Sequence, residues 1–160
     1  MDDIATLRRI LGENRVIAVV GLSGDWYRPS YFAAKYMLEH GYRVIPVNPR
    51  YAAQPSGILG QKCYASLREI PDKVGIVDIF RKTQDVIPIA EDAIAIGARV
   101  LWQQLGVTNE QAAAQARAAG MDAVMDRCVK IEHARLFGGL NWVGVNTKVI
   151  SAKRPRWLAY

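Results

Sequence analysis

Five short apolar stretches alternate along the chain with longer stretches in which apolar and polar residues recur at helical spacing. An apolar run of this length is typical of a strand that is buried on both faces, as in a parallel sheet. The predicted strands are VIAVVG at 16–21, RVIPVNP at 43–49, GIVDIF at 75–80, ARVLWQ at 98–103 and DAVMD at 122–126.

The stretches between them have helix signals. Ile4, Leu7 and Leu11 share one helix face, and residues 30–40 are bracketed by Pro29 and Gly41, which suit a helix entrance and stop. Residues 85–97 and 109–120 also form helix-like segments ending in glycine. We therefore expect an α/β fold: a doubly wound, mostly parallel, five-stranded Rossmann-like sheet with helices on both faces.

Ligands in such sheets bind beyond the carboxyl ends of the strands. This rule selects the loops after Gly21, Val47, Phe80 and Trp102 before any motif is considered. The long linker at 51–71, rich in glycine and proline, is not assigned to any element beyond a short turn or helix.

Length and composition narrow the class of protein. A chain of 160 residues, 51% of them hydrophobic, suits a single domain. No apolar run is long enough to span a bilayer, and acidic residues stand at the start where a signal peptide needs bases, so we expect a cytoplasmic protein without a membrane partner. Cys63 and Cys128 are too few for a disulfide framework or a cysteine-only zinc site.

The net charge of +6 favours an anionic partner. Four cations, Lys148, Lys153, Arg154 and Arg156, cluster near the C-terminus. This cluster is either a solvated tail or a surface that contacts nucleic-acid phosphates without sequence preference.

The first strand-end loop reads GLSGDWYRPS and departs from a dinucleotide fingerprint. Glycines are needed at the positions of Gly21, Ser23 and Trp26, and only the first is present. The N-terminus of the next helix still offers free N–H groups to a phosphate, and Ser23, Arg28 and Ser30 add donors. The alternative is an ordinary turn in which Ser30 is the N-cap.

The second strand ends in Asn48-Pro49-Arg50. NAD-binding domains usually place an acid about here for the ribose hydroxyls, about 20 residues past the glycine loop. An arginine instead suits a ribose that bears a phosphate, either the 2′-phosphate of NADP or the 3′-phosphate of coenzyme A. A solvated loop arginine is the alternative.

The third and fourth strands end in an aromatic with cations and in amides. Phe80, followed by Arg81 and Lys82, is placed either to flank an adenine or a pantetheine arm or to join the core. Gln103 lies at the end of the fourth strand, where its amide can meet a polar ligand group.

The segment Asp126–His133 offers no catalytic pair by its spacing. Five helical residues place the Cys128 and His133 side chains roughly 140° apart around a helix axis, which opposes both a metal site and a Cys–His pair. We interpret the segment as a helix with Cys128 at its buried start and charges on its outer side. The alternative is a thiol with a lowered pKa near the reactive end of a ligand.

Four segments in order, GLSGDWYRPSYFAAKYMLEHGYRVIPVNP, VDIFRK, VLWQQLG and MDRCVKIEH, resemble the small stand-alone CoA-binding proteins. Their fold is that of the CoA-binding domain in the succinyl-CoA synthetase alpha subunit. The resemblance covers roughly residues 10–136 and implies that the strand ends bind coenzyme A. It also implies a CoA-binding Rossmann-like domain at 1–136 and an arm at 137–160 that packs on the domain or on a second subunit.

The resemblance places the phosphates and the adenosine end at Ser23, Gly24, Asp25 and Trp26, a basic residue at Arg50, and a ligand wall at Ile79, Phe80 and Arg81. That wall is proline-rich in the synthetases, and this chain has no prolines there. With the residues selected above, the expected coenzyme A site consists of Gly21, Ser23, Gly24, Asp25, Trp26, Arg28, Arg50, Ile79, Phe80, Arg81 and Gln103.

We expect the protein to bind coenzyme A or an acyl-CoA without catalysis of its own, because its histidines, His40 and His133, have no triad-like partners. The spacing of Cys128 and His133 likewise gives no reason to expect a metal. A homodimer and a separate partner enzyme both stay open. The alternatives are an NADP-dependent oxidoreductase and a protein that binds nucleic acid nonspecifically through its basic C-terminal segment.

Overall fold

The computed structural model describes residues 3–138 and confirms the predicted fold class. Five parallel strands form one sheet in the order β2-β1-β3-β4-β5. Each strand lies within its predicted stretch, and the bounds are β1 Val16–Val20, β2 Arg43–Val47, β3 Ile76–Ile79, β4 Val100–Gln103 and β5 Asp122–Val124. The expected arm at 137–160 falls outside the described residues from residue 139 onward.

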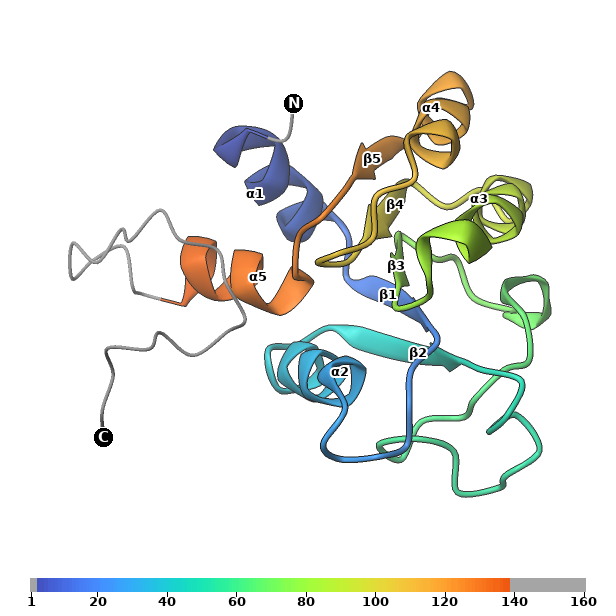
Figure 1. The fold of residues 1–160 in the computed structure, drawn as a ribbon. Coiled ribbons are helices and arrows are strands. Elements are labelled where there is room, and N and C mark those ends of the chain that lie inside the picture. The colour runs from blue at the N-terminus through green and yellow to red at the C-terminus, as the bar shows by residue number, and fades with distance from the viewer. Residues whose placement is uncertain (1–2, 139–160) are drawn as a thin grey trace.

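Helices cover both faces of the sheet (Figure 1). The helices of one face are α1 Ile4–Glu13, α2 Pro29–Glu39 and α5 Val129–Phe137, and those of the other are α3 Val86–Ala95 and α4 Glu110–Ala118. Two short 3-10 helices, η1 Leu67–Glu69 and η2 Thr83–Asp85, lie in the connections around β3. The chain is therefore doubly wound.

Alternation along the strands divides the core into two layers. Val77 and Ile79 of β3 pack beneath α3 and α4, while Ile76 packs beneath α1, α2 and α5. The buried face of α4 consists of small side chains, Ala112, Ala113 and Ala116, and this lets the helix approach the sheet closely. On the other face Trp102 of β4 is fully buried and donates its indole N–H to the carbonyl of Arg127 over 2.7 Å.

The linker at 51–71 returns to the sheet beside β2. Tyr64 forms an isolated parallel bridge with Val47, donating its N–H to the carbonyl of Pro46 (3.0 Å) and accepting one from Asn48 (2.9 Å). The linker thus lies along the outer edge of β2.

Two sequence-based interpretations need correction. Ser30 is not the N-cap of α2, since the helix begins at Pro29 and Arg28 occupies the cap position. Helix α5 does start after Cys128, as expected. The expectation that its charged residues lie on the outer side of the helix is wrong for Glu132, which is fully buried and paired with Arg127 and Arg135. No helix in residues 3–138 is long and apolar enough to cross a membrane.

Candidate functional site

The sheet changes its winding direction between β1 and β3, and the loops after these strands diverge there. Gly21 follows β1 with φ +86° and donates its N–H to the carbonyl of Val47 over 2.8 Å. A Cβ at this position would lie 2.5 Å from the carbonyl oxygen of Phe80. Glycine therefore lets the end of β1 pass directly against the end of β3.

The loop from Ser23 to Arg28 is held by its own side chains. Ser30 is buried and its Oγ accepts the N–H of Ser23 over 3.1 Å, while Ser23 Oγ accepts the N–H of Asp25 over 3.1 Å. Helix α2 has no side-chain cap; in its first turn Pro29 has no N–H, and the N–H groups of Tyr31 and Phe32 donate to the Arg28 carbonyl. What the helix start offers a negatively charged ligand group is the positive end of the helix dipole.

Asn48, just past β2, joins the first loop to the second. Its side-chain N–H donates to the carbonyl of Leu22 (3.0 Å), and its side-chain oxygen accepts the N–H of Arg50 (3.0 Å). Asparagine before a Pro-containing turn is a frequent signal for such local bonding. Asn48 was nonetheless missed as a site residue, because its bond to Leu22 joins loops 26 residues apart.

A cavity of about 420 Å³ opens among these loops, and we call it the α2 cavity. Among the residues that the structure describes, its cations are Arg28, Arg50 and Arg81, and its one carboxylate is Asp25. Arg81 forms a long ion pair with Asp85, at 3.9 Å. The full lining is Gly21, Ser23, Asp25, Arg28, Pro29, Ser30, Asn48, Arg50, Tyr51, Phe80 and Arg81.

A second cavity of about 340 Å³, the α3 cavity, adjoins the first and shares Gly21, Asn48 and Arg81 with it. Its other walls are mainly apolar or uncharged: Val20, Val47, Pro49, Ala65, Ser66, Leu67, Gln84, Pro88 and Ile89. Its carboxylates are Asp85 and Asp92, and Asp92 is paired with Arg68 at 2.6 Å. The two cavities therefore differ in charge, the first cationic and the second not.

Seven of the expected site residues line the α2 cavity: Gly21, Ser23, Asp25, Arg28, Arg50, Phe80 and Arg81. The other four line neither cavity. Ile79 and Gln103 are fully buried, and the Gln103 side chain bonds the backbone of Asn109. Gly24 lies against the ring of Tyr51, and Trp26 points its side chain into solvent, 69% exposed.

Two residues before Phe80, in β3, the carboxyl of Asp78 is buried and accepts a hydrogen bond from Gln104 over 2.6 Å. Burial raises the pKa of Asp78 to about 7, although the Gln104 bond opposes that rise. The pKa of the Cys128 thiol is also raised, first by burial and then by the nearby Asp78 charge. This contradicts the alternative of a thiol activated by a lowered pKa.

The two histidines lie together near the C-terminal end of α2. The Tyr36 hydroxyl lies 3.0 Å from His133 Nδ1, and the His40 and His133 ring centroids are 5.3 Å apart. Burial lowers the pKa of His133, with the charges of His40 and Arg15 acting in the same direction. Within residues 3–138, no His, Cys, Asp and Glu side chains gather in threes or more so as to hold a metal ion.

The chain is similar to known proteins over most of its length. The Bacillus subtilis (strain 168) protein YneT is 38% identical over 130 residues, 81% of this chain and 93% of YneT. A hypothetical protein from Pyrococcus horikoshii OT3 has a solved structure with TM-score 0.80 and 42% identity, covering 85% of this chain and 93% of that one.

A larger structure shares the fold alone. The apo form of a dinucleotide-forming acetyl-coenzyme A synthetase 1 from Ca. Korarchaeum cryptofilum matches with TM-score 0.62 and 24% identity over 75% of this chain and 28% of its own. The sequence model of the family described as the CoA binding domain matches residues 15–134. Because this match covers most of the sequence, the chain belongs to the CoA binding domain family.

Proposed function

We propose that the protein binds coenzyme A or an acyl-CoA across the two adjoining cavities and does not itself transform the ligand. The observation that carries the proposal is the contrast in charge between cavities that share Gly21, Asn48 and Arg81. Coenzyme A has the same contrast, because a purine base is neutral while the diphosphate and the 3′-phosphate are anionic. Membership of the CoA binding domain family supports the same ligand.

The phosphates belong in the α2 cavity. Three guanidinium groups can pair with phosphate oxygens there, and Arg28 and Arg50 make no ion pair with any residue in the range 3–138. Pro29 and Ser30 at the start of α2 line the same cavity, so the positive end of the helix dipole also favours a phosphate there. Within this cavity we assign the diphosphate to the Ser23–Arg28 loop and the 3′-phosphate to Arg50.

The adenine base belongs in the α3 cavity. Asp85 and Asp92 would repel a phosphate, whereas Pro49, Pro88 and Ile89 offer apolar walls for a flat ring. Ser66 and Gln84 supply neutral polar groups for its edge. The shared Arg81 then stands between the base and the phosphates.

The absence of catalysis in this proposal rests on where the histidines lie. Helix α2 has eleven residues, so its two ends are separated by about 16 Å at 1.5 Å per residue. The α2 cavity meets the helix at Pro29 and Ser30, while His40 and His133 meet at its other end. Neither histidine lines a cavity described above.

Two measurements test this function. Native mass spectrometry of the freshly purified protein reads any retained ligand by mass, and the same spectrum gives the oligomeric state. Isothermal titration then compares coenzyme A with NADPH, for which the incomplete glycine fingerprint predicts much weaker binding.

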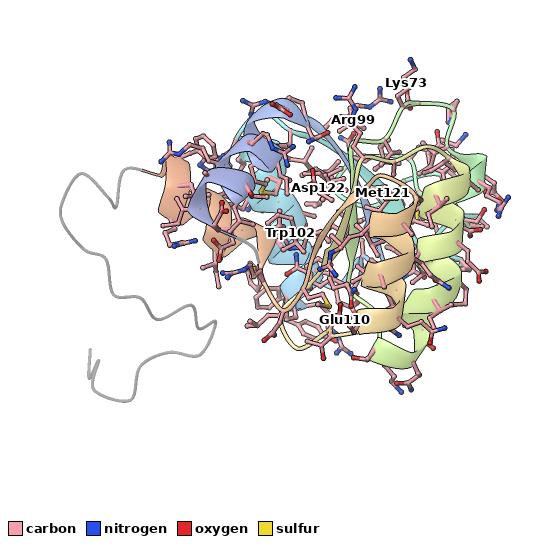
Figure 2. All side chains as sticks on the ribbon, turned by 90° about the horizontal axis from the view of Figure 1, so that it is seen from above. Lys73, Arg99, Trp102, Glu110, Met121 and Asp122 are labelled. Carbon is pink, nitrogen blue, oxygen red and sulfur yellow. The ribbon has the colours of Figure 1, made fainter. Side chains whose placement is uncertain are left out.

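Arg81→Ala is the variant of choice for this titration, and Arg99→Ala is its matched control. Arg99 is exposed just before β4, at the amino ends of the strands and thus opposite the candidate site, near Lys73 and away from Glu110 at the start of α4 (Figure 2). We expect Arg81→Ala to weaken coenzyme A binding at least about tenfold, as a lost charged contact does, and Arg99→Ala to leave it unchanged. Tighter binding of NADPH than of coenzyme A would overturn the proposal.

A further inference from the structure

Gly24 lies in the first strand-end loop but lines neither cavity, and the atoms that a side chain there would meet belong to the second loop. A Cβ added to Gly24 would lie 2.9 Å from Cε1 of Tyr51 and 3.4 Å from its Cζ. The backbone of Gly24 has no positive φ that would require a glycine. What the glycine permits at this position is therefore the close approach of the Tyr51 ring.

Tyr51 also contacts the cation to which the 3′-phosphate is assigned. The guanidinium carbon of Arg50 lies over the Tyr51 ring at 5.6 Å from its centroid, within the range of a cation–π contact. Both residues line the α2 cavity. Asn48 holds the backbone of Arg50 by accepting its N–H, and the ring of Tyr51 holds its side chain.

One ring thus connects the first loop to the cation of the second loop. An arginine side chain that moves freely loses rotamer freedom when it binds a phosphate, and this loss weakens binding. A side chain that already lies over a ring in the cavity loses less of this freedom. The contact with Tyr51 therefore favours binding of a phosphate by Arg50.

We propose that Tyr51 is a positioning residue that sets the preference of the site for a ligand with a 3′-phosphate, and that Gly24 serves the same preference by leaving room for the ring. This inference rests on the proposed function, in which Arg50 binds the 3′-phosphate and the Ser23–Arg28 loop binds the diphosphate. Tyr51 acts through Arg50, so its contribution is confined to ligands that carry the 3′-phosphate.

The test is isothermal titration of the full chain with coenzyme A and dephospho-CoA, and the readout is the ratio of the two affinities. Tyr51→Ala should lower this ratio about threefold, as expected for the loss of a cation–π contact near the surface. Tyr51→Phe should keep the original ratio, because it keeps the ring. General damage to the fold or to the diphosphate loop would lower both affinities together and would not change the ratio.

Gly24→Ala tests the connection between the two loops. The new methyl group should displace the Tyr51 ring, because the atoms it meets are at the end of a side chain. We therefore expect Gly24→Ala to lower the ratio by about the same factor of three, although position 24 is in the other loop. In the Tyr51→Ala background the same substitution should have no further effect on the ratio, since the ring is already absent.

Tyr27→Ala is the matched control, because the Arg28 guanidinium lies over the Tyr27 ring at 5.5 Å and Arg28 lines the same cavity. Arg28 belongs to the loop assigned to the diphosphate, which both ligands carry, so Tyr27→Ala should leave the ratio unchanged.

Four outcomes would each overturn the inference and leave coenzyme A binding standing. They are a ratio near one in the original protein, an unchanged ratio in Tyr51→Ala or in Gly24→Ala, a ratio that falls equally in Tyr51→Phe, and a ratio that falls equally in Tyr27→Ala. If the original protein melts cooperatively but binds neither ligand, the proposed function itself fails.

Discussion

The side-chain amide of Gln104 donates a 2.6 Å hydrogen bond to Asp78 Oδ1, and both residues are buried. Asp78 lies on β3 opposite Val19 of β1 and Trp102 of β4, on the face covered by α1, α2 and α5. A carboxyl group in such surroundings is favoured in its neutral form. The pair therefore places a proton-binding group inside the core, two residues along the chain from Phe80 of the α2 cavity.

This group makes stability depend on pH. The pKa of Asp78 is about 7 in the folded protein and near its ordinary value of 3.8 in the unfolded chain. The folded state thus binds more protons between these values, and the free energy of unfolding falls as the pH rises through that window and levels off above it. At about 1.4 kcal/mol for each pKa unit, the total loss is up to roughly 4 kcal/mol.

Asp78→Asn should remove this dependence, because an amide stays neutral and can still bond Gln104. Urea unfolding of both proteins at about pH 5 and about pH 8 gives the comparison, in which the other titrating groups cancel. We take the free energy of unfolding of Asp78→Asn minus that of the original protein at each pH. This difference should be larger at the upper pH than at the lower pH, because only the original protein loses stability as Asp78 ionises. A difference that is the same at both pH values would show that Asp78 is ionised throughout.

Arg50 is assigned to the 3′-phosphate, and the assignment predicts a difference between two ligands. Coenzyme A should raise the melting temperature more than dephospho-CoA does at equal concentration, since tighter binding stabilises the folded state more. Arg50→Ala should narrow that gap. Differential scanning fluorimetry measures all four combinations, and equal shifts with both ligands in the original protein would remove Arg50 from this role.

Gly21→Ala should both destabilise the protein and disturb the site. The new methyl group would meet the Phe80 carbonyl at 2.5 Å, and the backbone at φ +86° disfavours any side chain. The two effects together should lower the free energy of unfolding by more than about 2 kcal/mol.

Gly12→Ala is the control for that experiment. Gly12 is an exposed residue of α1, and a Cβ added there would have no neighbouring atom within 4 Å, so alanine should stabilise the helix by up to about 1 kcal/mol. Chemical denaturation of both variants separates the effect of a clash from that of a glycine replacement in general. Equal changes would contradict the close approach of β1 to β3.

Glu132 is fully buried and forms ion pairs with both Arg127 (3.2 Å) and Arg135. Removing one partner of a buried ion pair leaves charge without compensation, so Glu132→Ala should lower the free energy of unfolding by about 3 kcal/mol or more. Glu110→Ala is the control, because Glu110 pairs with Arg117 on the surface and should contribute less than about 1 kcal/mol. A small effect at both positions in urea unfolding would contradict the buried network.

The repeating pattern of strands and helices predicted the sheet because a strand that is buried on both faces appears in the sequence as a continuous apolar run. The strand order places the first and third strand ends together, and the residues chosen at those ends, Gly21, Phe80 and Arg81, do line one cavity. These residues could be predicted from the sequence because each of them directly follows its strand, so the position of the strand end fixes the position of the residue.

Features that depend on contacts between distant segments were not predictable in the same way. The charge of Glu132 favours the surface in any pattern, and only the approach of Arg127 and Arg135 allows its burial. Ser30 has the chemistry of an N-cap, but Pro29 starts the helix one residue earlier and turns the Ser30 hydroxyl toward Ser23. The pairing of His40 with His133 likewise depends on how α2 and α5 pack.

The linker beside β2 has a consequence for association between chains. An open sheet presents unpaired backbone groups at its outer strands, and these can recruit a strand from another molecule. Here Pro46 has no N–H to offer, and Tyr64 already bonds the Pro46 carbonyl and the Asn48 N–H. Pairing of a strand from another molecule with the end of β2 nearest the site is therefore blocked. This end of the sheet is thus protected from the growth of cross-β aggregates.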